Sequence, residues 1–324
     1  MTGLADALRE AFGERLQLGE PLAPFTTFKL GGPADLFVTV DRSDELQRAV
    51  VLGREAGVPV TVIGGGSNLL IADEGIRGLV IRTRGGTVRE VEAGRIRADA
   101  GVTINGLVRW TIAHGFASLE AWAGTPGTVG GAIYGNAHFQ GRNIGDLVAS
   151  VQLLSPDGRF VEVPSAEMEF AYDYSRLHRT GEIVLSADFR VAPGEPDELR
   201  AVARESLAYR KRTQPLSMPS AGCIFQNPIP GRDPVPADVP WSAGALVDRA
   251  GLKGAREGQA RVSPTHGNFI VNEGGASSGD VRTLIDRCKR DVYRRYGVRL
   301  REEIVSLGFE RRGNGGDGVS GGES

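Results

Sequence analysis

Apolar positions near the start of the chain recur every four residues, as on one face of a helix. Leu4, Leu8, Phe12 and Leu16 follow this spacing, which predicts an amphipathic helix over residues 1–19. Later runs change to the alternation and short apolar blocks that strands show. The expected elements that follow are a short strand at 26–30, a strand at 35–40, a helix at 43–57 and a strand at 58–65.

The middle of the chain predicts mainly strands, and its last third predicts a smaller unit of helices and strands. The middle elements are strands at 88–94 and 95–101, a helix at 103–115, a hairpin at 148–163, a strand at 181–191 and a helix at 195–215. We place a domain boundary near residue 200, which divides a region over 20–200 from one over 201–309. Residues 310–324 are glycine-rich and almost without apolar side chains, so we expect a disordered tail. This order of elements predicts an α+β protein.

Composition narrows the class of protein. The 324 residues suggest two or three domains, and 40% hydrophobic with 24% charged residues is typical of a globular protein. A formal net charge of −2 does not favour nucleic acid or a membrane surface as partner, and we expect no obligate protein partner. Two cysteines, and a first segment unlike a secretory signal, favour a reducing cytoplasm. The four histidines have no metal-ligand spacing, so we expect no metal.

Two glycine-rich loops are the first candidate for chemistry. In the first, the predicted strand runs into Gly64, Gly65 and Gly66, followed by Ser67 and Asn68. Glycines let successive backbone N–H groups approach an anion, and the two polar side chains add donors. The loop does not fit the G-x-G-x-x-G dinucleotide pattern, and three glycines alone would favour a tight turn without a ligand.

The second loop reads "GTPGTVGGAIYGNA" and carries no charge. Its expected ligand-binding residues are Gly124, Thr125, Gly127, Thr128, Gly130 and Gly131. A structural turn does not need so many small residues, whereas a loop lying flat against a large ligand does. Two uncharged glycine loops together predict a dinucleotide held from both sides.

Several stretches resemble the UDP-N-acetylenolpyruvoylglucosamine reductases, the MurB family. They are "TTFKLGGPA", "GGGSNLL", "GTPGTVGGA", "SAGCIFQNP", "AGLKGAREGQARVSPTHGNFIVN" and "VRLREEIVSLG". The resemblance covers residues 20–309 and implies a two-lobed FAD-binding domain of the vanillyl-alcohol-oxidase type over 20–200. It implies a smaller α/β substrate domain over 201–309. Since the family's extra tyrosine-bearing segment is missing, the chain resembles the shorter class.

The resemblance also implies an activity. The enzyme would bind FAD non-covalently and use NADPH to reduce the enolpyruvyl ether of UDP-N-acetylglucosamine to UDP-N-acetylmuramate, for peptidoglycan. The small-molecule partner would thus be a UDP-sugar enolpyruvyl ether. Such a reaction needs an acid that is still protonated at neutral pH and groups that stabilise an enolate.

Three catalytic residues follow from the family's motifs. Cys223 stands where the family usually has a proton-donating serine, and a thiol is mostly protonated at pH 7. Without the motif, a small buried hydrophobe would be the commoner interpretation of a free cysteine. Glu303 matches the family's carboxyl residue, and its neighbour Glu302 is interpreted as a solvated charge. The family's arginine, in F-x-Y-R-x-S, aligns with Asp173, so Arg176, three residues on, is the candidate replacement.

Substrate contacts implied by the resemblance are Tyr172, Arg210, Arg212, Gln214, Gln226, Asn227 and His266. Gln226 replaces the family's usual lysine. Arginines at the end of the helix could bind a diphosphate through their forked donors, but cations there also simply complement the helix dipole. A proline-rich insert over 229–241 follows the "FQNP" motif.

Two other functions compete with the reductase. An FAD-dependent oxidase or dehydrogenase of a hydroxy acid or sugar lactone would share the glycine loops but would not need Cys223 or Glu303. A non-catalytic nucleotide-binding protein is the other alternative, because the family's arginine is missing at position 173.

Overall fold

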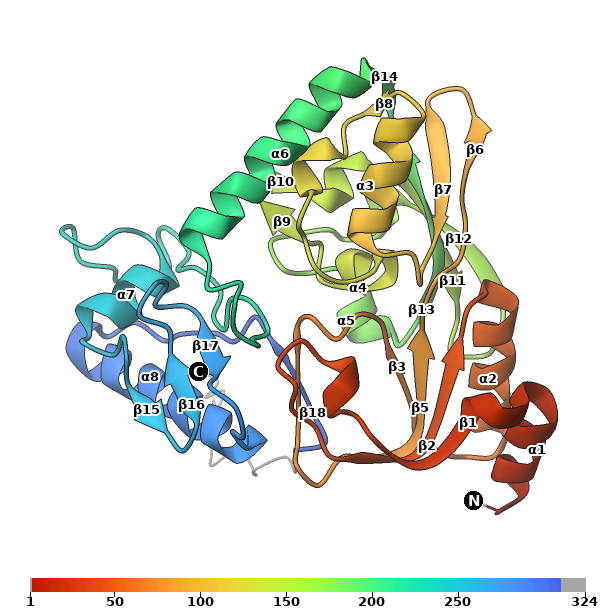
Figure 1. The fold of residues 1–324 in the computed structure, drawn as a ribbon, viewed down its shortest axis with the longest axis horizontal. Coiled ribbons are helices and arrows are strands. Elements are labelled where there is room, and N and C mark those ends of the chain that lie inside the picture. Colours follow the sequence, from red (N-terminus) through yellow and green to blue (C-terminus); the bar gives the residue numbers. More distant parts are fainter. Residues whose placement is uncertain (1, 310–324) are drawn as a thin grey trace, which may run out of the picture.

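A computed structural model describes residues 2–309 and arranges them in three units (Figure 1). The second and third units each have one apolar core, and the first has two. The first unit contains α1 (Thr2–Phe12), β1 (Leu16–Pro21), β2 (Pro33–Val40), α2 (Ser43–Glu55), β3 (Val60–Ile63), β4 (Leu69–Ile71) and β5 (Ile76–Thr83). Its four-stranded sheet has the order β1-β2-β5-β3, antiparallel between β1 and β2 and parallel elsewhere. Helices α1 and α2 cover this sheet with Leu8, Leu46 and Val50.

Two expected elements of this unit were wrong. The helix expected over 1–19 ends at Phe12, because Gly13 adopts φ +57°, a left-handed conformation that ends a helix. Residues 16–21 instead form β1, which pairs with β2. The strand expected at 26–30 is a turn, in which Phe28 packs into the core of the third unit.

The second unit is built on a five-stranded antiparallel sheet of order β12-β11-β13-β7-β6. Its elements are β6 (Val88–Glu92), β7 (Arg95–Asp99), α3 (Ile104–Ala113), β8 (Phe116–Ala117), α4 (Val129–Tyr134), β9 (His138–Phe139), β10 (Arg142–Asn143), β11 (Val148–Leu154), β12 (Phe160–Pro164), α5 (Leu177–Thr180), β13 (Ile183–Arg190), β14 (Ala192–Pro193) and α6 (Pro196–Thr213). The long helix α6 packs Leu199 and Ala203 into this unit's core. The unit therefore extends past the boundary expected near residue 200, to the end of α6.

The third unit contains α7 (Ala243–Arg249), β15 (Arg256–Glu257), β16 (Ala260–Val262), β17 (Ile270–Asn272) and α8 (Ser278–Tyr296). Its three-stranded antiparallel sheet has the order β15-β16-β17 and lies against α8 (Figure 1). The chain then returns to the first unit, where β18 (Val305–Leu307) pairs in parallel with β4. This return places the residues just before β18 beside the first glycine loop.

Short 3-10 helices complete the connections, at Gly13–Arg15, Ala23–Phe25, Glu120–Trp122, Ile144–Leu147 and Ser165–Glu167. The expected α+β fold, with a two-lobed N-terminal part and a smaller α/β unit, is confirmed. The expected tail at 310–324 lies outside the described residues. Within residues 2–309, no helix combines the length and apolar character that crossing a bilayer requires.

Candidate active site

The two glycine loops, residues 64–68 and 124–131, pack directly against each other. A Cβ atom built on Gly65 would lie 2.9 Å from the Cα of Gly127, and one on Gly64 would lie 2.2 Å from Thr128 Oγ1. Gly66 has φ +63° and a Cβ there would lie 2.1 Å from the carbonyl oxygen of Phe25. These positions admit only glycine, because any larger residue would collide with backbone or with a buried threonine.

Main-chain donors of both loops are left free by the protein. Among residues 2–309, the N–H groups of Gly65, Gly66 and Ser67 in one loop, and of Gly127 and Thr128 in the other, have no protein acceptor. Gly66 and Thr128 are nevertheless buried. Buried N–H groups without an acceptor are costly, so these donors fit the phosphates of a dinucleotide such as FAD.

Other groups that were expected to bind the cofactor form hydrogen bonds within the protein instead. The Asn68 side-chain amide donates to the carbonyl oxygen of Glu303 at 3.0 Å, and Thr125 Oγ1 accepts a 2.7 Å bond from Arg210. The N–H of Gly124 donates to Asn105 Oδ1 at 2.7 Å. The N–H groups of Gly130 and Gly131 are satisfied by Ala100 and Thr128. Fewer residues are therefore available to bind a cofactor than the sequence led us to expect. We call the residues with free N–H groups the glycine cradle: Gly65, Gly66, Ser67, Gly127 and Thr128.

Cys223 and Glu303 are brought together by backbone pairing. Ile224, which follows the cysteine, accepts a 2.8 Å hydrogen bond from the N–H of Glu303, and Gln226 N donates to Arg301 at 2.9 Å. Gly222 has φ +79°, which turns the chain just before the thiol. The Asn268 side chain holds both backbone groups of Phe225, at 2.9 and 2.7 Å. The thiol and the carboxyl therefore project from two segments with fixed register.

Electrostatics keep the Cys223 thiol protonated. Burial raises its pKa strongly, and the neighbouring Glu303 and Asp173 carboxyl groups raise it further. A hydrogen bond with Asn268 and the charge of Arg210 oppose this rise only in part. Because the pKa of a thiol is well above 7 even without these neighbours, Cys223 keeps its proton at neutral pH.

The two adjacent glutamates differ, but Glu302 is not the solvated charge expected from the sequence, because its side chain is only 20% exposed and pairs with two cations. Burial, with the Asp173 charge, raises the pKa of Glu303 to about 8, so its carboxyl is largely protonated at neutral pH. Glu302 accepts hydrogen bonds from the Arg282 and Lys289 side chains, and these bonds lower its pKa despite burial. Of the two glutamates, only Glu303 is suited to act as a protonated acid at the site.

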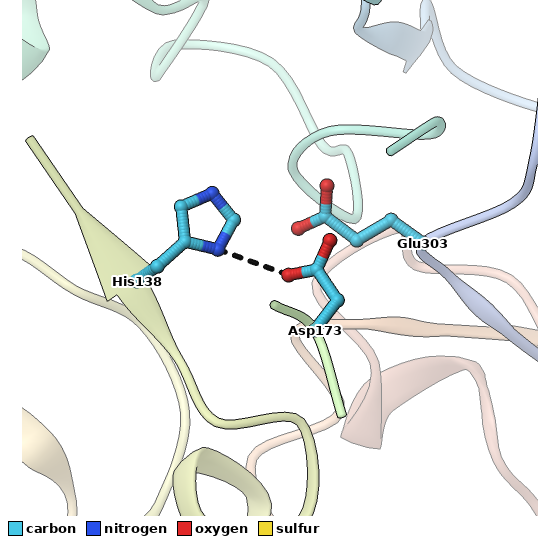
Figure 2. A group of neighbouring side chains, drawn as sticks. All are labelled: His138, Asp173 and Glu303. Carbon is cyan, nitrogen blue, oxygen red and sulfur yellow. Dashed lines mark ion pairs between the residues drawn. The ribbon is translucent and has the colours of Figure 1, made fainter. Parts of the chain in front are cut away.

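A histidine and an aspartate from the second unit face Glu303 (Figure 2). His138 Nδ1 lies 2.9 Å from Asp173 Oδ1, and one polar atom from each of His138, Asp173 and Glu303 lies within 4.8 Å of the others. The Asp173 side chain is only 8% exposed, and its Oδ2 has no partner among the described residues. The hydrogen bond to Asp173 raises the pKa of His138, which favours the imidazolium.

Arg176 is not part of this group. Its guanidinium makes two 2.9 Å hydrogen bonds with the Glu182 carboxylate and a third bond to the Glu167 carbonyl oxygen. The side chain of Glu182 is 7% exposed, so this ion pair is largely buried. The prediction that Arg176 takes the place of the missing arginine was therefore wrong, because this side chain is fixed elsewhere.

A pocket of about 480 Å³ opens beside the carboxyl groups. Its lining includes Tyr172, Asp173, Gln226 and Glu303. The Tyr172 hydroxyl accepts a 3.4 Å hydrogen bond from the N–H of Asn227. The side-chain oxygen of Asn227 accepts the N–H of Ala243, so it organises the start of α7. Tyr172 and Gln226 are thus the substrate-site predictions that line the pocket.

The remaining expected substrate residues separate into buried and exposed positions. Arg210 is buried, its guanidinium carbon lies 3.8 Å from the Phe139 ring centroid, and burial lowers its pKa to about 10. Arg212 is exposed, and Gln214 follows the end of α6. His266 uses Nδ1 to accept the N–H of Asn268 at 3.2 Å, so it supports the loop that holds Phe225.

His138 is the site residue that the sequence did not indicate. It lies in "NAHFQG", after the second glycine loop, and nothing in its local pattern points to chemistry. One signal was available: an acid at position 173, where the resembled pattern has arginine, requires positive charge from another residue.

Two protein-family models match the chain. One, an FAD binding domain, matches residues 34–164, and the other, the C-terminal domain of UDP-N-acetylenolpyruvoylglucosamine reductase, matches residues 214–307. The second match begins where α6 ends.

Whole proteins with similar sequence cover nearly the full chain. UDP-N-acetylenolpyruvoylglucosamine reductase 2 of Symbiobacterium thermophilum is 39% identical over 95% of this chain and 98% of its own length. The reductase 1 of Bacillus anthracis is 38% identical over 95% of this chain and all of its own. The crystal structure of the Thermus caldophilus reductase superposes with a TM-score of 0.74 at 35% identity, covering 90% of this chain and 98% of that one.

Proposed function

Because the chain belongs to the UDP-N-acetylenolpyruvoylglucosamine reductase family, we propose that it reduces the enolpyruvyl ether of UDP-N-acetylglucosamine to UDP-N-acetylmuramate with NADPH. The product serves peptidoglycan synthesis. The observation that carries the proposal is the pairing of the segments that hold Cys223 and Glu303, beside glycine loops with free N–H donors. Burial raises the pKa of both side chains, which favours the protonated thiol and carboxyl. A hydroxy-acid or lactone oxidase would need the cradle but not this pair of acids.

The cradle holds the cofactor, and the remaining residues act on the substrate. Gly65, Gly66, Ser67, Gly127 and Thr128 would hold the FAD diphosphate through their free N–H groups. Bound FAD would supply the transfer of a hydride from NADPH to the unsaturated carbon of the enol ether. The protein must then supply a proton to the neighbouring carbon and stabilise the negative charge beside the substrate carboxylate.

Cys223 is the proton donor in this proposal. Its thiol is protonated through neutral pH, and the enolate carbon is a far stronger base than a thiolate, so transfer toward carbon is downhill. The hydrogen bonds from Asn268 to Phe225 hold the segment that carries the thiol. Precise placement matters more here than acidity, because the donor must lie within hydrogen-bond reach of one carbon.

Glu303 stabilises the enolate in its protonated form. An ionised carboxylate would repel the developing charge, whereas a neutral carboxyl can donate a hydrogen bond to the enolate oxygen. Burial keeps the group neutral, and the Asn68 amide fixes its backbone next to the cofactor loop. Tyr172 and Gln226, which line the pocket, would contact the substrate, and Arg210 would place positive charge between the glycine loop and the thiol.

We place the reaction in the cytoplasm. Both cysteines, Cys223 and Cys288, are free, as expected in a reducing compartment. An oxidising environment would threaten the thiol on which this mechanism depends.

The direct test uses the purified flavin-containing protein. NADPH oxidation should depend on added enolpyruvyl nucleotide, and UDP-N-acetylmuramate should accumulate in equal amount. Rapid oxygen consumption with a hydroxy acid or sugar lactone, and no reaction with the nucleotide, would instead favour the oxidase. A protein that binds the nucleotide but consumes no NADPH would be a binding protein.

A further inference from the structure

The loop that should carry a catalytic arginine carries an acid. The resembled pattern places arginine at position 173, yet this chain has Asp173 there, and Arg176 is held by Glu182. An enolate beside a carboxylate still needs positive charge. Another cation of this chain must therefore lie beside residue 173.

His138 is next to the position in question (Figure 2). Its Nδ1 lies 2.9 Å from Asp173 Oδ1, and its ring centroid lies 4.8 Å from that of Tyr172, which lines the pocket. The Glu303 carboxyl completes the group, in which one polar atom from each of the three residues lies within 4.8 Å of the others. The imidazole therefore faces both the carboxylate that it binds and the acid assigned to the enolate (Figure 2).

The charges around His138 favour its protonated form. The hydrogen bond to Asp173 has the largest effect in raising its pKa, and the charge of Asp173 acts in the same direction. Burial and the charge of Arg210 act in the opposite direction. Arg210 itself is committed to the second glycine loop and the Phe139 ring.

The conformation of residue 173 suits an aspartate. Its φ of +52° is a left-handed conformation that aspartate tolerates better than most residues. Ala171 and Tyr174 close the loop by exchanging two backbone hydrogen bonds, and the Asn136 amide donates to Ala171. The loop thus holds the carboxylate in a fixed position for the imidazole.

We propose that the imidazolium of His138, oriented by Asp173, supplies the positive charge that the resembled family places on an arginine at position 173. His138 would face the substrate carboxylate and enolate, and Asp173 would act as its positioning residue. This inference rests on the proposed reductase function.

The pairing is tested by titrating the histidine directly. Nuclear magnetic resonance of the oxidised holoenzyme with ¹⁵N-labelled histidine, assigned with His138→Gln, gives the protonation of each ring. His138 should titrate above 6.5, the ordinary value, and Asp173→Asn should move its titration to lower pH. An unchanged titration in Asp173→Asn would overturn the proposal.

Rapid-mixing kinetics test the role in the reaction. His138→Gln should leave flavin reduction by NADPH unchanged and slow reoxidation by the enolpyruvyl nucleotide roughly 100-fold, the loss typical of one charge-stabilising donor. His138→Lys should recover part of that rate, because an ammonium restores the charge. The exposed His114, stacked on Trp110, provides the matched control, and His114→Gln should change neither half-reaction.

Besides an unchanged titration, three kinetic results would overturn the inference. One is normal reoxidation in His138→Gln, and another is His138→Lys being as slow as His138→Gln, which indicates a structural role. The third is loss of reoxidation with a chelator and recovery with a divalent metal, which would assign the charge to a bound cation. If the wild-type protein does not oxidise NADPH in the presence of the enolpyruvyl nucleotide, the proposed function is wrong. The titration of His138 would still show whether it forms an ion pair with Asp173.

Discussion

The N–H of Glu303 donates a 2.8 Å hydrogen bond to the carbonyl oxygen of Ile224, the residue after Cys223. This bond fixes the segment that carries the carboxyl against the segment that carries the thiol. Because Asn68 also donates to the carbonyl of Glu303, the same segment is attached to the first glycine loop. Three distant stretches of sequence therefore share one small hydrogen-bonded frame.

We predict that Cys223→Ala separates the two half-reactions. NADPH should still reduce the flavin, while reoxidation by the nucleotide should fall by a factor of about 100 or more, since general acid catalysis contributes that much. Cys223→Ser should keep much of the rate because a hydroxyl can also donate a proton. Stopped-flow absorbance of the flavin band measures both steps.

Cys288 is the matched control for this variant. It lies on α8 and is buried in the core of the third unit, so Cys288→Ala should lower thermal stability and leave both half-reactions intact. Normal reoxidation in Cys223→Ala would remove the thiol from the mechanism.

The neighbouring glutamates provide a second matched pair. Glu303→Gln should slow reoxidation by the nucleotide about 100-fold or more if the acid proton matters. Glu302→Gln should retain the kinetics and lose only the ion pairs with Arg282 and Lys289, at a cost on the order of 1 kcal/mol. Equal kinetic losses in the two variants would indicate that the segment responds to any change, and that Glu303 has no special role.

Burial of Glu303 also predicts how stability depends on pH. Its pKa rises from 4.5 to about 8 on folding, so between these values the folded state binds more protons than the unfolded state. Stability should therefore fall as pH rises from 4.5 through 8, by a few kcal/mol at most, at about 1.36 kcal/mol per pKa unit. Glu303→Gln should abolish this dependence of stability on pH. Urea midpoints of both holoproteins across this range measure the difference, and parallel curves would contradict the assignment.

Arg210 and Arg212 lie two residues apart on α6 and differ in burial. Arg210→Ala removes the bond to Thr125 and the contact with Phe139, and it should weaken FAD binding roughly tenfold, as expected when a buried partner is left unsatisfied. Arg212→Ala should bind FAD normally, since that side chain is exposed. Titration of the apoprotein with FAD, followed by flavin fluorescence, compares them.

The contact between the glycine loops predicts a steric effect. Gly65→Ala would place a methyl group 2.9 Å from the Cα of Gly127, so the loops must separate and FAD content should drop. Gly3→Ala in α1 is the control, because nothing lies within 4 Å of its added methyl group. The flavin-to-protein absorbance ratio after gel filtration reports the loss, and full occupancy in Gly65→Ala would argue against the cradle.

Local sequence patterns indicated the candidate site more clearly than they indicated its ion pairs. The glycine loops and the thiol motif were recognisable because their composition is unusual and local. Leu16 continued the helical spacing, but Gly13 turns the chain, and pairing with β2 decides the structure of residues 16–21. The strand pattern at 26–30 failed because Phe28 is buried by a core formed much later in the chain.

The ion pairs in and near the candidate site were the features that the sequence predicted least well. Arg176 lies close in sequence to the position of the missing arginine, but its guanidinium binds the Glu182 carboxylate. A spacing of six residues does not by itself predict such a pair. His138 and Asp173 meet only because β9 and the Ala171–Tyr174 turn lie together in the folded second unit. Such contacts depend on tertiary structure, which local patterns do not encode.

The pairing of β18 with β4 has a mechanical consequence. It fastens the third unit to the first, in addition to the chain that leaves α6. The same two units also share Phe28, which packs into the third unit's core, and a hydrogen bond from Ser278 to the carbonyl oxygen of Ile71. Folding itself therefore sets the segments of the thiol and the carboxyl against the first glycine loop.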